Sequence, residues 1–111
     1  MTKTQKLTQL VEDLAVEREK FTQASERLAK MDEEIAKNKK EVGEIMEFIT
    51  SKVKDTEFKE ICSPRLMRKI YDCGKEVGRL EKASLSLRAY TDSLEKRCTD
   101  IWNTLYETSK Q

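Results

Sequence analysis

Apolar residues recur at every seventh position along the first half of this chain. The row consists of Leu7, Leu14, Phe21, Leu28, Ile35, Val42 and Ile49. An apolar repeat of seven residues corresponds to 3.5 residues per turn, so its members lie on one stripe of an α-helix. The row therefore predicts a long helix that packs a second helix against this stripe.

A companion row lies three residues further along the same segment. Its members are Leu10, Glu17, Ala24, Met31, Asn38, Ile45 and Lys52. Glu17 and Asn38 occupy positions where a facing helix would press, and polar residues at such positions lower stability while fixing register or partner choice. An alternative interpretation is that the seam is loose there and open to water.

The second half of the chain repeats the pattern with its own heptad row. This row is Leu66, Cys73, Leu80, Leu87, Leu94 and Ile101, and its apolar companions are Ile70, Val77, Ala83, Tyr90, Cys98 and Leu105. Ala83 and Tyr90 follow row members by three residues, whereas the others follow by four. This change of spacing predicts an apolar stripe that shifts along the helix, as on a helix with more than one neighbour.

The only proline, Pro64, separates the two patterns. Proline fits the first position of a helix, and a preceding serine such as Ser63 can cap the exposed amides. We expect one all-α domain over residues 1–111. It is a long antiparallel helical hairpin with arms at about 4–54 and 64–108 and a short helical connector at 55–63, since short connections join antiparallel neighbours.

Composition restricts the possible functions. Charged residues form 39% of the chain and hydrophobic residues 37%, so the apolar residues suffice for stripes on helices. The net charge of +1 does not indicate binding of nucleic acid. No apolar stretch reaches the roughly 18 residues of a membrane span. Histidine is absent, which removes the commonest general base and metal ligand. We expect no catalytic, cofactor or metal site.

The three cysteines are Cys62, Cys73 and Cys98, an odd number without metal or redox spacing. They predict reduced thiols in a cytoplasmic protein. Cys62 precedes a helix start and Arg65, which favours a modestly reactive thiol. Gly74 and Gly78 have a spacing that allows two helices to approach closely. We expect them to leave room on the second helix where the first helix crosses it near Asn38.

Apolar residues outside the stripes gather at both ends of the expected hairpin. The free end holds Trp102, Tyr106, Val11 and Val16, and the turn end holds Phe48, Phe58, Ile61, Met67 and Tyr71. Exposed aromatic and methionine side chains on a helical surface are typical anchors of interfaces. At the turn end, the connector could instead fold over the cluster and cover it.

The sequence thus favours a non-enzymatic structural or adaptor protein. It would associate with other helices in a homo-oligomer or as a subunit of a hetero-complex. The alternative is a small helical chaperone or co-chaperone that holds a client through an apolar end of the hairpin.

Overall fold

The computed structural model describes residues 2–53 and 63–111. Two helices account for nearly all of them: α1 spans Lys3–Val53, and α3 spans Pro64–Lys110. No strand occurs in these two ranges. The predicted all-α fold is confirmed.

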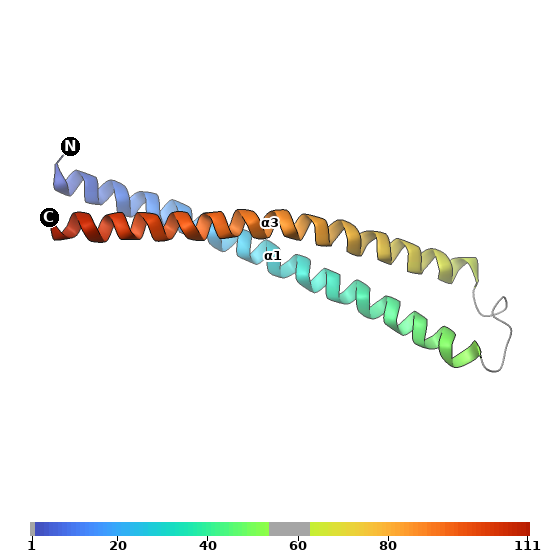
Figure 1. Ribbon diagram of the computed structural model, residues 1–111. Helices are drawn as coiled ribbons and strands as arrows, with labels where there is room; N and C mark the ends of the chain where they lie inside the picture. The colour runs from blue at the N-terminus through green and yellow to red at the C-terminus, as the bar shows by residue number, and fades with distance from the viewer. Residues whose placement is uncertain (1, 54–62) are drawn as a thin grey trace. The chain divides into compact units, whose positions relative to one another are not determined.

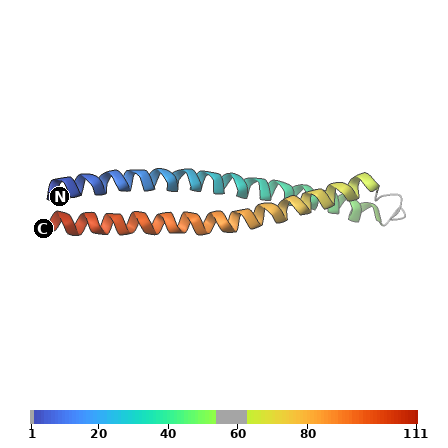
Figure 2. The same cartoon turned by 90° about the horizontal axis from the view of Figure 1, so that it is seen from above.

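Contacts divide the chain into two units, and in each of them α1 packs beside α3. Unit 1 comprises Met1–Ala29 and Leu85–Gln111, and unit 2 comprises Lys30–Ser84. The beginning of α1 therefore packs with the end of α3, and the end of α1 packs with the beginning of α3, so the helices are antiparallel as predicted (Figure 1 and Figure 2). In unit 1 the two chain ends are neighbours, and Lys3 Nζ lies 3.5 Å from the Ser109 carbonyl oxygen.

Both helices begin at a polar cap. The Leu66 amide donates to Ser63 Oγ at 3.2 Å, which confirms that Ser63 caps the helix starting at Pro64. At the start of α1, the Gln5 amide donates to Thr2 Oγ1 at 3.1 Å and the Thr2 amide donates to Gln5 Oε1 at 3.0 Å. This reciprocal arrangement is a capping box, and the Thr-x-x-Gln spacing in the sequence could have identified it.

The apolar rows form the seam between the helices. The buried apolar residues are Leu14, Ala24 and Leu94 in unit 1, and Ile49, Cys73 and Leu80 in unit 2. Every member of the two heptad rows is buried or half-buried. The stripes predicted from the seven-residue period are thus the faces that the helices present to each other.

One part of the predicted stripe on α3 is wrong. Tyr90 is 50% exposed, whereas Ser84 and Thr91 are buried and keep the four-residue companion spacing. Ser84 Oγ donates to the Glu81 carbonyl at 2.9 Å, and Thr91 Oγ1 donates to the Leu87 carbonyl at 2.8 Å. Because these hydroxyls bond within their own helix, they enter the seam without an unsatisfied donor. The four-residue spacing thus continues through Ser84 and Thr91, while Ala83 is half-buried as expected.

The expectation for the glycines of α3 is also wrong. Gly74 and Gly78 are exposed, and a Cβ atom added at either one would meet nothing within 4 Å. Gly43 on α1 has the same free space. The glycines therefore do not serve close packing between α1 and α3.

Candidate partner-binding surfaces

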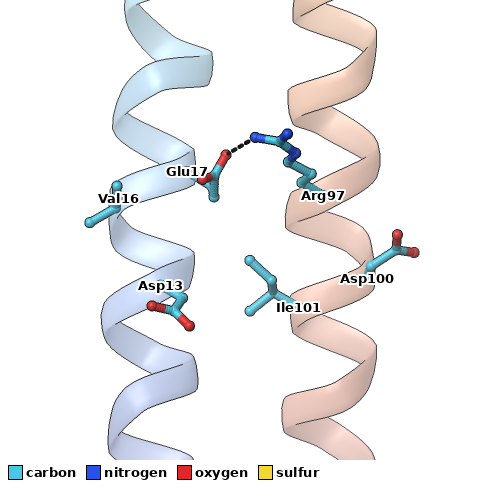
Figure 3. A pocket seen from close by; sticks show the side chains of 6 residues that line it. All are labelled: Asp13, Val16, Glu17, Arg97, Asp100 and Ile101. Atoms are coloured by element: carbon cyan, nitrogen blue, oxygen red, sulfur yellow. Dashed lines mark ion pairs between the residues drawn. The ribbon is translucent and has the colours of Figure 1, made fainter.

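Unit 1 holds a groove beside a cross-helix ion pair. Its lining residues are Asp13, Val16, Glu17, Arg97, Asp100 and Ile101, and its volume is about 360 Å³. Glu17 and Arg97 point toward each other from the two helices (Figure 3), with Glu17 Oε2 3.6 Å from Arg97 Nη1. Lys20 Nζ lies 3.4 Å from Glu17 Oε1.

The carboxylate of this ion pair is largely buried. The Glu17 side chain is 15% exposed, and its Oε2 atom is buried without a hydrogen bond in the described structure. At 3.6 Å, Arg97 supplies charge compensation, while a direct hydrogen bond would need a shorter distance. The low exposed fraction argues against a loose seam open to water at Glu17, and a role of Glu17 in fixing register stays a prediction.

Trp102 lies in a second groove of unit 1, on the other side of the seam. This groove is lined by Leu14, Arg18, Cys98, Thr99 and Trp102 and has a volume of about 270 Å³. Trp102 is 55% exposed, and Tyr106, one turn further along α3, is 52% exposed. Lys110 Nζ lies 4.3 Å from the Tyr106 ring centroid, which gives this ring a cation–π contact.

The structure does not bring all four predicted free-end residues together. Val16 lines the groove beside the ion pair and points away from α3 (Figure 3), whereas Trp102 lines the groove that contains Arg18. Val16 and Arg18 are two residues apart, so their directions differ by about 160° at 3.6 residues per turn. Val11 precedes Arg18 by seven residues and is on the Arg18 side. Both valines are exposed.

At the other end of the helices, the described candidates are exposed as expected. Phe48, Met67 and Tyr71 belong to unit 2, and each is about half exposed or more. Phe58 and Ile61, together with the predicted connector apart from Ser63, lie outside the described residues. The possibility that the connector covers this cluster stays a prediction.

Three exposed apolar residues were missing from the candidate set: Met46, Leu85 and Tyr90. Tyr90 lies in a groove with Lys20, Gln23, Ala24 and Arg27. Leu85 is the most exposed large apolar side chain at 68%. Its position outside the heptad row was the available signal, since an apolar residue between stripe members must face another direction.

The buried thiol of unit 2 contacts a carboxylate on the opposite helix. Cys73 Sγ donates to Glu41 Oε2 at 3.6 Å across the two helices. Burial raises the pKa of the Cys73 thiol, and the Glu41 hydrogen bond and negative charge raise this pKa further. A higher thiol pKa disfavours the reactive thiolate at Cys73. Cys62 lies outside the described residues.

Neither metal-ligand clustering nor a membrane span is found within residues 2–53 and 63–111. No three cysteine, aspartate or glutamate side chains converge there to hold a metal ion. Neither α1 nor α3 contains an apolar stretch long enough to cross a membrane.

The fold and these surfaces define an antiparallel helix pair with exposed aromatic side chains. No protein-family model, curated protein or solved structure matches the chain.

Proposed function

We propose that this protein is a non-enzymatic structural or adaptor protein that binds other helices. The partner is either a second copy of the chain or a helical subunit of a larger assembly. The observation that carries the proposal is the pair of half-exposed aromatic rings in unit 1, Trp102 and Tyr106.

The energetics favour these two rings as binding anchors. Covering a half-exposed aromatic side chain removes on the order of 100 Å² from water, which contributes about 2.5 kcal/mol at ~25 cal/mol per Å². Tryptophan and tyrosine are also enriched among the residues that dominate binding energy at protein interfaces. Two such rings one turn apart give a helical partner a continuous apolar contact.

The test replaces both rings by serine. Because both lie outside the seam, the double variant Trp102→Ser and Tyr106→Ser should keep the helical circular dichroism spectrum. Association with itself or with a captured partner should weaken by about tenfold or more. Light scattering measures self-association, and a pull-down from cell extract measures capture of other proteins. Tyr90→Ser is the matched control, since Tyr90 is an equally exposed ring in another groove.

Two outcomes would contradict the proposal. A folded double variant that associates as the wild type does would remove Trp102 and Tyr106 from the interface. Unfolding of the double variant would place the rings in the intramolecular core. A partner that binds and is then released would favour the chaperone alternative over a permanent assembly.

A further inference from the structure

One side of unit 1 is built from uncharged residues between Arg18 and the chain ends. On α1 these residues precede Arg18 at helical spacing and are Thr4, Thr8, Val11 and Ala15. On α3 they surround Trp102, which lines a groove together with Arg18, and they are Thr99, Trp102, Tyr106 and Ser109. All of these residues are exposed. We call them the uncharged surface.

The other side of unit 1 is charged over the same length. It holds the groove beside the Glu17 ion pair. Its exposed charged residues are Lys6, Asp13, Arg97, Asp100 and Glu107. Charged residues form 39% of the chain, so chance alone rarely leaves an exposed surface of this size uncharged. Depletion of charge around aromatic residues is the compositional mark of the centre of a protein interface.

The Trp102 groove connects the uncharged surface to the seam. Its lining includes Leu14, which is only 8% exposed, and the half-buried Cys98. The groove has a volume of about 270 Å³. Binding anchors of protein interfaces are large side chains that fill such pockets, so this groove suits an aromatic ring from a partner. A ring seated there would extend the core between α1 and α3 of unit 1.

The Trp102 ring and the groove it borders lie at different levels along unit 1. Counted from the contact between Glu17 and Arg97, Trp102 is about two residues nearer to the chain ends than Leu14 and about six nearer than Arg18. At 1.5 Å per residue, the middle of the groove is displaced from the ring by about 6 Å. A second copy of the chain therefore places its ring in this groove only if it is shifted or reversed along the helix direction.

We propose that two copies of the chain pack through the uncharged surface, related by a two-fold axis perpendicular to the helices of unit 1. This inference rests on the proposed function and names the partner as a second copy. The axis lies midway between ring and groove, so the Trp102 ring of each copy enters the groove of the other in an isologous interface. A two-fold axis parallel to the helices would keep equal levels together, and the ring would miss the groove. The contact needs only unit 1 of each copy.

The charges that border the uncharged surface lie at the rim of this interface. Arg18, at the edge of the groove, stacks on the indole of Trp102 of the partner subunit in a cation–π contact, while its guanidinium stays in water. Glu95 precedes Trp102 by two turns and faces the hydroxyl of Tyr106 of the partner subunit, which donates to the carboxylate. Lys110 contacts its own Tyr106 ring from the next row outward. The arrangement thus buries no charge without a partner.

The area of the uncharged surface fits a specific dimer. Trp102, Tyr106 and Val11 each expose about half of their surface. Together they offer on the order of 300 Å², and the smaller residues around them roughly double this area. Two copies would bury on the order of 1,200 Å², which is the lower end of the range for specific interfaces. We therefore expect a dimer that forms at micromolar rather than nanomolar concentration.

A charge exchange tests the reversed orientation. The proposed axis places Val11 of each copy beside Ala15 of the partner subunit. Val11→Lys alone brings an ammonium close to Arg18 of the partner subunit, and Ala15→Glu alone presses a carboxylate against valine. Each variant should therefore dimerise at least about tenfold more weakly than the wild type. In an equimolar mixture the new ammonium meets the new carboxylate at one contact and the other contact keeps its wild-type residues, so the affinity of the heterodimer should approach that of the wild type.

Val16→Lys is the matched control for Val11→Lys. Val11 and Val16 are 53% and 54% exposed on the same helix, and Val16 lies in the groove on the other side of the seam. Val16→Lys should therefore leave the dimer affinity unchanged. Sedimentation equilibrium of each chain and of the mixture measures the affinities, and circular dichroism verifies that each variant keeps its helices.

The outcomes separate this inference from the proposed function. A wild-type chain that stays monomeric at high micromolar concentration, equal effects of Val11→Lys and Val16→Lys, or a mixture without a heterodimer would each overturn the inference. Unfolding of Val11→Lys would place Val11 in the seam and overturn it as well. If a monomeric chain still captures another protein through Trp102 and Tyr106, the proposed function stands without the dimer. If neither association occurs, both are wrong.

Discussion

Arg97 on α3 reaches Glu17 on α1 across the seam of unit 1, with 3.6 Å between Nη1 and Oε2. The pair joins a largely buried carboxylate to an exposed guanidinium, so each helix supplies one charge to the recognition of the other. A buried carboxylate that loses its cross-helix cation is costly, whereas a well-packed apolar pair can be as stable as the ion pair.

Removal of Arg97 should therefore destabilise unit 1 through Glu17. We expect Arg97→Ala to lower the free energy of unfolding by about 1 kcal/mol, less than for a fully buried pair because Arg97 is exposed. Adding Glu17→Leu to the Arg97→Ala chain should recover the lost free energy of unfolding. Urea unfolding measures the three free energies, and a double variant less stable than Arg97→Ala would contradict this role of Glu17.

Asn38 should lower stability at the seam of unit 2. It is half-buried, and its Nδ2 donates to the Glu34 carbonyl of its own helix at 2.9 Å. Because this bond does not cross to α3, Asn38→Leu replaces a partly desolvated amide with an apolar contact and loses no interhelical bond. The melting temperature should rise by several degrees and the choice of partner or oligomer should loosen. A lower melting temperature would mean that the amide makes a bond that leucine cannot replace.

Leu94 should be the most sensitive position of unit 1. Its side chain is 1% exposed, so Leu94→Ala leaves a cavity at the seam and should lower the free energy of unfolding by about 3 kcal/mol. Leu85→Ala is the control, since Leu85 is 68% exposed and should change the stability of the single chain by less than about 0.5 kcal/mol. Chemical unfolding at low protein concentration gives both values, and equal effects would contradict the described seam.

Cys73 should make the stability of unit 2 depend on alkaline pH. Burial and Glu41 raise the pKa of its thiol in the folded chain above the ordinary value of 9.0. The thiol therefore stabilises the folded chain fully below that value, and this contribution is lost as pH rises through the higher folded pKa. The melting temperature of the wild type should fall more steeply above pH 9 than that of Cys73→Ala. Parallel curves for the two chains would show that the thiol does not titrate differently in the folded state.

Sequence periodicity was sufficient for the helices and for most of the seam. Heptad rows identify a stripe without tertiary information, because the angle per residue in a helix is nearly constant. Ser63 and Pro64 likewise fix the start of α3, since a cap and an initial proline act through local geometry alone. The antiparallel pairing followed from the short stretch between the two patterns.

The tertiary structure decided which polar residues enter the seam and which apolar residues remain outside it. Ser84 and Thr91 can be buried because the hydroxyl of each bonds within its own helix. Tyr90 is exposed, although its apolar ring made it the expected seam residue. The tertiary structure also placed Val16 and Trp102 in different grooves. The sequence analysis had grouped these two residues because they lie at similar distances from the turn. Distance along a helix is set by residue number, but the side of the seam depends on how two helices are rotated against each other. That rotation is fixed by packing between residues far apart in the chain, which a local pattern does not record.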